Sequence, residues 1–100
     1  MSAIPLSGKQ RRHLKSLAHH LEPVVFLGKE GITDGLIEGV QKALRDHELI
    51  KIKFVAFKDQ KKELSLQIAE KTSSAHVDNL GHIAIFFKST KGKISMDPKS

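Results

Sequence analysis

The chain has 100 residues, a mass of 11.1 kDa, no cysteine and a formal net charge of +6. This length allows one domain, and a hydrophobic content of 39% supplies one modest core, which excludes a wholly disordered chain. The absence of cysteine excludes a disulfide scaffold, a thiolate zinc site and a cysteine nucleophile. No apolar run approaches the about 20 residues of a membrane span, and the N-terminus lacks the apolar block of a secretory signal. We therefore expect a cytoplasmic protein without a membrane partner.

The excess positive charge lies at the two ends of the chain. Residues 1–20 contain four basic side chains and no acid, and residues 88–100 contain four lysines and one aspartate. The segment between them is close to neutral. A basic pole on a near-neutral body is typical of a protein that binds a polyanion such as nucleic acid. Solubility alone is the other interpretation, and the charge pattern does not decide between the two.

A helix is predicted from Ser7 to His20. Ser7 and Gln10 have the spacing of a capping box at its start. Apolar residues recur at the spacing of one helical face, at Leu14, Leu17, Ala18 and Leu21. Basic residues recur along another face, at Arg11, Lys15 and His19, with Arg12 beside them. The segment is therefore expected to pack one side against a core and to present cations on another.

A short strand and a second helix follow Pro23. Val24–Leu27 is a continuous apolar run rich in β-branched residues, which predicts a strand buried on both faces. Thr33 is the expected N-cap of the next helix, and Asp34 suits the positive end of its dipole. The core-facing stripe of this helix is Leu36, Ile37, Val40, Ala43 and Leu44.

The second half of the chain predicts three more strands and one ambiguous segment. The strands are Leu49–Phe57, Ala75–Leu80 and His82–Lys88. Leu64–Thr72 fits both the alternation of a strand and a helical row, so its type stays open. The order is α-β-α-β-(α or β)-β-β, and a helix in the fifth place gives a two-layer α/β sandwich.

The turn Gly28-Lys29-Glu30-Gly31 joins the first strand to the second helix. Its glycines free the backbone, whose N–H groups, together with the following helix N-terminus, favour an anion such as phosphate. KH domains use a G-x-x-G loop of this kind to hold a nucleic-acid backbone. An ordinary strand-to-helix turn is the alternative, and Glu30 has to point away from any bound phosphate.

No arrangement typical of a metal site or an active site is found in the sequence. The six histidines lack a zinc-ligand spacing, and no nucleophile-elbow signature occurs. We therefore expect no metal, no cofactor, no small-molecule substrate and no enzymatic activity. The five phenylalanines do not form the RNP signature of an RRM, which favours recognition of backbone and shape over base stacking.

Four motifs together resemble the bacterial YhbY-like, CRM-domain (chloroplast RNA splicing and ribosome maturation) RNA-binding family. The resemblance covers residues 7–90, nearly the whole chain. The motifs are KQ followed by HLK-x-LAH over residues 9–19, PVV-x-LG-x-x-GIT-x-G over 23–35, HELIKIK over 47–53 and LGH over 80–82.

The resemblance implies an α/β two-layer sandwich with a mixed four-stranded sheet and about three helices, in the order α-β-α-β-α-β-β. The C-terminal domain of translation initiation factor three has this fold. Residues 58–74 then form the third helix, residues 1–90 a single CRM-type RNA-binding domain and residues 91–100 a flexible basic tail. Family members commonly end the last strand with Tyr-Arg, where this chain has Phe87-Lys88. The RNA-binding residues expected from charge and resemblance are Lys9, Arg11, Arg12, Lys15, Gly28, Lys29, Glu30, Gly31, Lys51, Lys53 and Lys88.

The resulting hypothesis is a monomeric protein that binds structured ribosomal RNA and assists assembly of the large ribosomal subunit. The first helix, the glycine loop and the tail are expected to form one basic surface. A protein–protein adaptor on ribosomal particles is one alternative, with shallow salt dependence and no binding to naked RNA. A DNA-architectural protein is another, with equal affinity for duplex DNA and RNA.

Overall fold

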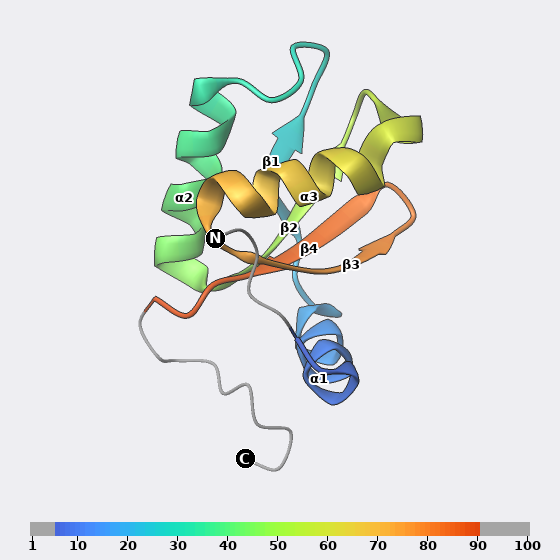
Figure 1. Ribbon diagram of the computed structural model, residues 1–100, viewed down its shortest axis with the longest axis vertical. Helices are drawn as coiled ribbons and strands as arrows, with labels where there is room; N and C mark the ends of the chain where they lie inside the picture. Colours follow the sequence, from blue (N-terminus) through green and yellow to red (C-terminus); the bar gives the residue numbers. More distant parts are fainter. Residues whose placement is uncertain (1–5, 91–100) are drawn as a thin grey trace.

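Eight segments of regular structure organise residues 6–90, the part of the chain that the computed structural model describes (Figure 1). In chain order they are α1 (Gly8–Ala18), β1 (Pro23–Leu27), α2 (Asp34–His47), β2 (Leu49–Phe54), the short 3₁₀ helix η1 (Lys58–Gln60), α3 (Lys61–Thr72), β3 (Ala75–Leu80) and β4 (Ile83–Phe87). The strands form one sheet in the order β1-β2-β4-β3, in which β1 and β2 are parallel and the other neighbours antiparallel. This mixed sheet with three α-helices confirms the predicted fold class.

The predicted capping box is present at the start of α1. The Ser7 hydroxyl accepts a hydrogen bond from the Gln10 N–H (3.1 Å), and the Gln10 side chain accepts one from the Ser7 N–H (3.0 Å). These two bonds satisfy N–H groups that have no partner within the helix. The helix ends at Ala18, two residues before the predicted His20.

The segment that the sequence left open is a helix, α3. Leu64, Ile68 and Ala69 pack against the core at helical spacing, whereas Leu66, which a strand would place beside them, is 53% exposed. The helix ends at Thr72, and the next residue, Ser73, caps it in a left-handed conformation (φ 55°). The order α-β-α-β-α-β-β is therefore the one that the resemblance implies.

Helices lie on both faces of the sheet. α2 and α3 pack on one face and complete the two-layer sandwich, with a core that includes Leu27, Val40, Leu44, Ile52, Phe54, Ile68 and Phe86. α1 lies against the other face, on a smaller core of Leu14, Ala18, Leu49, Val77, Ile85 and Phe87. We call this second face the open face, because α1 lies at its lower end in Figure 1 and leaves the upper end uncovered.

β1 is an edge strand, and the prediction that it is buried on both faces is wrong. Val25 and Leu27 pack on the core beneath α2, but Val24 is 46% exposed and Phe26 is 57% exposed on the open face. α1 packs at the other end of this face and does not extend over Phe26. All residues of this run are apolar, although only alternate side chains face the core and the others lie on an exposed side of the strand.

β2 ends at Phe54, three residues before the predicted Phe57. The N–H groups of Val55 and Ala56 both donate to the carbonyl of Leu27, at 2.9 and 3.2 Å. Phe57 then adopts a left-handed conformation (φ 56°), which directs the chain into η1. The bend ties the end of β2 to the end of β1, directly before the glycine loop.

The predicted basic tail, residues 91–100, lies outside the described residues. Across residues 6–90, no helix has both the length and the apolar character that crossing a membrane requires.

Candidate nucleic-acid interface

Two of the four lysine and arginine side chains on α1 bind β3, and the other two do not. Arg11 donates from Nη1 to a β3 carbonyl (3.0 Å), and Lys15 forms an ion pair with Asp78 (2.9 Å). Lys9 and Arg12 are exposed, and neither has a hydrogen-bond or ion-pair partner within residues 6–90. Lys15 is therefore the one of these four cations that an acid neutralises within residues 6–90, and Lys9 and Arg12 are the two without any partner there.

Asp78 neutralises part of the charge that the sequence assigns to α1. Burial acts to raise the pKa of this carboxyl, but the hydrogen bond from Lys15, the backbone N–H of Asn79 and the nearby positive charges outweigh it and lower the pKa below its usual range. The carboxylate is therefore ionised at neutral pH and pairs with Lys15. Lys15 contributes less to an anion-binding surface than the sequence predicts.

Two lysines of the predicted RNA-binding set are used by the fold instead. Lys51 is only 8% exposed, and its Nζ donates to the carbonyl of Leu21 (2.9 Å). Lys88 is half-buried, and its Nζ donates to the carbonyl of Thr72 at the end of α3 (3.0 Å). Each ammonium thus satisfies a carbonyl at a chain connection, and the structure does not place either as an exposed RNA contact.

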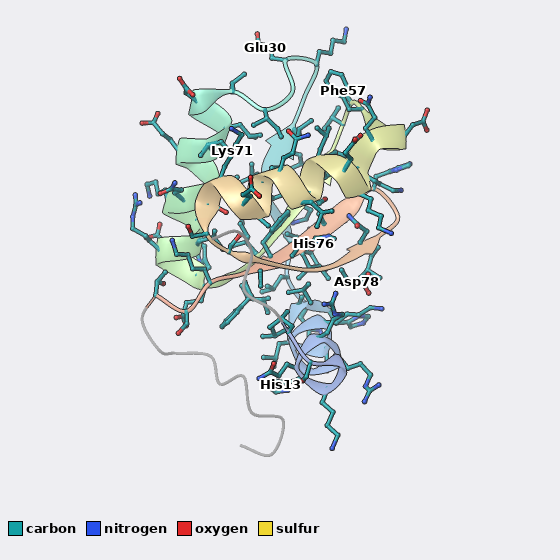
Figure 2. The ribbon with its side chains drawn as sticks, in the orientation of Figure 1. His13, Glu30, Phe57, Lys71, His76 and Asp78 are labelled. Carbon is teal, nitrogen blue, oxygen red and sulfur yellow. The ribbon has the colours of Figure 1, made fainter. Side chains whose placement is uncertain are left out.

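The glycine loop forms a tight turn above the N-terminus of α2. The Gly31 N–H donates to the Gly28 carbonyl (3.0 Å), and Gly31 has a left-handed conformation (φ 71°) that favours glycine. The Phe57 ring lies 3.6 Å from the place that a Cβ on Gly31 would occupy, so it supports the loop from behind. Lys29 and Glu30 are exposed, and Figure 2 shows Glu30 at the outer end of the loop.

A shallow hollow of about 520 Å³ lies beside this loop. Its lining includes the loop itself, Phe26 from β1, and Thr33 and Leu36 from the start of α2. The Thr33 hydroxyl accepts the N–H of Leu36 (3.1 Å) as the predicted N-cap. The hollow therefore combines an exposed ring, a lysine and a helix N-terminus, which suits a phosphate with an adjoining base.

The sequence suggested that the first helix and the glycine loop belong to one basic surface. In the structure they do not form a compact surface. Figure 2 places His13 of α1 and Glu30 of the loop at opposite ends of the molecule. β1 runs the length of the sheet between them, because it starts just after α1 and ends at the loop. Any ligand that touches both has to cross the open face.

A row of side chains on the open face joins the two ends. Phe26, Lys53, Ile83 and Leu80 are register neighbours across the sheet, one from each strand. At the β3 side, Leu80 lines a hollow with Arg12 and other α1 residues, and at the β1 side Phe26 lines the hollow of the loop. Lys53 is exposed and lies between them. The row therefore makes a continuous path from the α1 cations to the loop.

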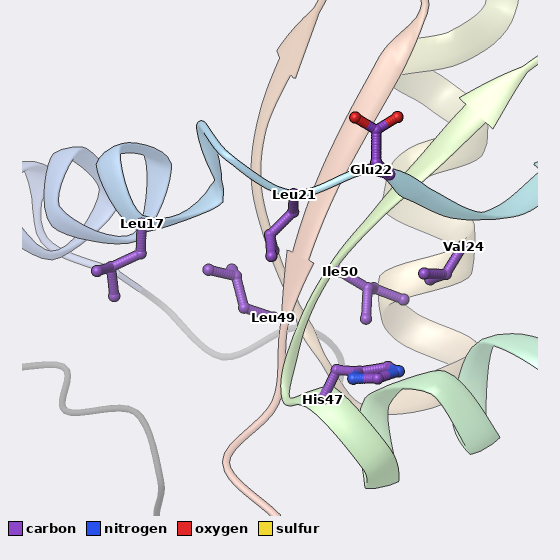
Figure 3. Close-up of a pocket in the computed structure, with 7 residues that line it drawn as sticks. All are labelled: Leu17, Leu21, Glu22, Val24, His47, Leu49 and Ile50. Carbon is purple, nitrogen blue, oxygen red and sulfur yellow. The ribbon is translucent and has the colours of Figure 1, made fainter.

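A separate groove of about 370 Å³ has an apolar character (Figure 3). Its lining residues are Leu17, Leu21, Glu22, Val24, His47, Leu49 and Ile50. Three of them, Leu17, Leu21 and Val24, are large exposed apolar side chains. The groove offers one imidazole and one carboxylate but no lysine or arginine, so it does not extend the cationic path.

Residues 6–88 match the family model of the CRS1 / YhbY (CRM) domain, which covers most of the chain. The chain belongs to the CRM-domain family. This match confirms the resemblance inferred from the four sequence motifs, and it spans every helix and strand described above.

Similar proteins are found in several bacteria. A Haemophilus influenzae protein named RNA-binding protein is 42% identical over 96 residues, which cover 94% of this chain and 97% of that protein. The protein named probable RNA-binding protein YqeI, from Bacillus subtilis, is 33% identical over 87 residues, covering 86% and 91% of the two chains. The solution structure of a hypothetical protein from Staphylococcus aureus has a TM-score of 0.79 and 35% identity, covering 90% of this chain and 95% of that one.

Two features of this CRM domain were missed from sequence. Phe26 is an exposed ring beside the loop, and only the edge position of β1 reveals it, because its apolar neighbours suggest burial. Glu48, part of the HELIKIK motif, is fully buried with a left-handed φ of 64°, and its carboxylate accepts the N–H of Thr90 (2.6 Å). The motif acid therefore fastens the end of the described chain to α2 and does not face a ligand.

Among residues 6–90 of the CRM domain, no group of three or more His, Cys, Asp or Glu side chains is placed to hold a metal ion. His76 is half-buried, and its buried Nε2 atom has no hydrogen-bond partner within the described residues. Burial lowers the pKa of His76, so its ring is neutral at pH 7.

Proposed function

We propose that this protein binds structured RNA with the open face of its CRM domain and assists assembly of the large ribosomal subunit. The observation that carries the proposal is the position of Lys53, an exposed cation in the middle of the row between the α1 cations and the glycine loop. A polyanion that follows this row meets Arg12, Lys53 and Lys29 in succession. The names of the Haemophilus and Bacillus relatives support RNA as the ligand.

The mechanism is electrostatic positioning with one ring contact. Exposed lysines and arginines neutralise phosphates and release counterions, which makes affinity depend steeply on salt. Four phosphates at Lys9, Arg12, Lys29 and Lys53 give an expected slope of about −3 to −4 in log affinity against log salt. The exposed ring of Phe26 offers a face on which an unpaired base can stack next to the loop. This contact supplements the backbone recognition expected from sequence.

Filter binding with a structured ribosomal RNA fragment over a salt series tests this surface. Lys29→Glu and Arg12→Glu are expected to weaken binding for RNAs of different sequence and to lower the salt slope by roughly 0.7 to 0.9 for each lost contact. Lys71→Glu is the matched control, because Lys71 is exposed on α3 and lines a hollow with α2 residues away from the open face. Equal losses of RNA affinity for all three variants would contradict binding by the open face and would indicate general charge attraction instead.

The role in assembly needs its own experiment. A sucrose gradient of cell lysate, probed for this protein at low and high salt, is expected to show migration with large-subunit precursors at low salt only. A signal confined to the top of both gradients would contradict stable association with ribosomal particles. Equal affinity for duplex DNA and structured RNA would favour a DNA-architectural protein.

A protein adaptor is the second candidate, and the apolar groove of Figure 3 is the observation that favours it. Exposed Leu17 and Val24 suit a protein contact more than a phosphate. A Leu17→Glu variant separates the two functions. If the protein binds RNA with the open face, the variant keeps its affinity for naked RNA. If the protein is an adaptor, the variant loses its association with ribosomal particles in the gradient.

A further inference from the structure

Four basic side chains converge at the junction of β2, η1, α3 and the β3–β4 turn. Lys53, Lys58 and Lys61 come from the first three segments, and His82 comes from the turn. The Nζ of Lys61 lies 3.4 Å from Nδ1 of His82, and Lys53 pairs in register with Ile83, the next residue along the chain. Nearly thirty positions separate the first member from the last, so the cluster exists only in the folded chain.

The turn that carries His82 is fixed by the backbone. Gly81 has a left-handed conformation (φ 59°), and the carbonyl of His82 accepts the N–H of Phe54 (2.8 Å). The backbone of this turn therefore places His82 at the end of the sheet, beside the lysines.

The cluster is rich in positive charge that the fold does not neutralise. Desolvation, followed by the charges of Lys61, Lys58 and Lys53, lowers the pKa of His82, and Asp59 is the acid that opposes them. Within residues 6–90, none of the three lysines forms an ion pair with a carboxylate. Lysine charges gathered around one turn without a paired carboxylate create a positive potential, so the arrangement suits a bound anion.

We propose that Lys53, Lys58, Lys61 and His82 form a phosphate-binding site, which takes a phosphate of the RNA backbone. This proposal rests on the proposed function, because Lys53 belongs to both the open-face row and the cluster. The site lies beside the β2–β4 middle of the row, and Gly28–Gly31 lies at its β1 end. Two anchors on one strand of RNA would fix its path across the sheet.

Phosphate at this site changes the protonation of His82. An adjacent anion favours the imidazolium and opposes the lysine charges, so RNA binding takes up a proton there. RNA affinity is therefore expected to increase as pH falls from about 7.5 to about 5.5, since the ordinary histidine pKa is about 6.5. A phosphodiester does not titrate in this window, and His82→Asn is expected to remove the part of the increase that belongs to this site.

The test compares two neighbouring lysines at the start of α3. Lys61→Gln is expected to weaken binding of the structured RNA by about five- to tenfold at 0.1 M salt. Lys62→Gln is the matched control, because Lys62 is exposed next to Lys61 but is not among the charges that shift the pKa of His82. Equal losses for both variants, or no loss for Lys61→Gln, would overturn the proposal.

Two-dimensional NMR of the histidine rings separates failure of the site from failure of RNA binding. In the RNA-free protein, Lys61→Gln is expected to raise the pKa of His82 toward its ordinary value, and this readout does not depend on a ligand. If Lys29→Glu weakens RNA and Lys61→Gln does not, RNA binding stands and the site is wrong. If the parent protein binds no RNA, inorganic phosphate is used as the probe instead of RNA. A phosphate-induced shift of the His82 NMR signals that Lys61→Gln abolishes would support a site for free phosphate. The absence of any such shift would overturn the proposed site.

Discussion

Lys51 and Lys53 provide an internal comparison between a lysine that stabilises the fold and a lysine that faces a ligand. They lie two residues apart on β2 and therefore point to the same face of the sheet. Lys51 is buried with its Nζ on the Leu21 carbonyl, whereas Lys53 is exposed without a partner in the described chain. Replacing each with alanine is expected to produce opposite results in two assays.

The stability effect of Lys51→Ala follows from its contacts. A hydrogen bond from a charged donor contributes about 1.5 to 3 kcal/mol, and truncation also removes the packing of the buried aliphatic stem. We therefore expect a loss of about 2 to 3 kcal/mol in the free energy of unfolding. For a domain of this size that loss corresponds to a decrease in Tm of roughly 8 to 24 °C. Lys53→Ala is expected to change stability by less than about 0.5 kcal/mol.

Two assays check the comparison, urea denaturation and RNA filter binding. Both are carried out at a temperature well below the Tm of Lys51→Ala. Lys51→Ala is expected to keep the RNA affinity and salt slope of the parent, and Lys53→Ala to lose affinity and to lower the slope by roughly 0.7 to 0.9. A Lys51→Ala protein that is as stable as the parent but binds RNA weakly would refute the reasoning, because it would make Lys51 a ligand contact. A Lys53→Ala protein with unchanged RNA binding would remove the centre of the open-face path.

Three further predictions concern the loop, the exposed ring and the half-buried histidine. Gly31→Ala is expected to destabilise the fold by about 1 to 2 kcal/mol in thermal unfolding, because its φ is 71°, whereas Gly28→Ala, with open space around it, should be nearly neutral. Phe26→Ala should weaken binding of RNA with unpaired bases by about 1 to 3 kcal/mol in titrations and leave fully paired RNA unaffected. His76 has a lowered pKa in the folded state, so the unfolded chain takes up its proton first, and stability should be constant above about pH 6.5 and fall below it. Urea midpoints at several pH values should show a weaker fall in His76→Phe.

Local sequence determined much of the fold. The Ser7–Gln10 capping box and the Thr33 N-cap were predicted because a cap depends on residues three positions apart. The bounds of β3 and the first residue of β2 were predicted correctly from alternation and turn residues. α3 needed the family resemblance, because a nine-residue window with both periodicities does not separate helix from strand.

The candidate site depended on tertiary structure at almost every position. Alternation places Lys51 and Lys53 on one face, but only the path of the α1–β1 connection decides that Lys51 meets the Leu21 carbonyl. The exposure of Phe26 follows from the edge position of β1 and from the place where α1 packs. Sequence spacing determines which side of an element a residue occupies. Burial, pairing and the meeting of distant charges, as at Lys61 and His82, are set by long-range packing that no local pattern encodes.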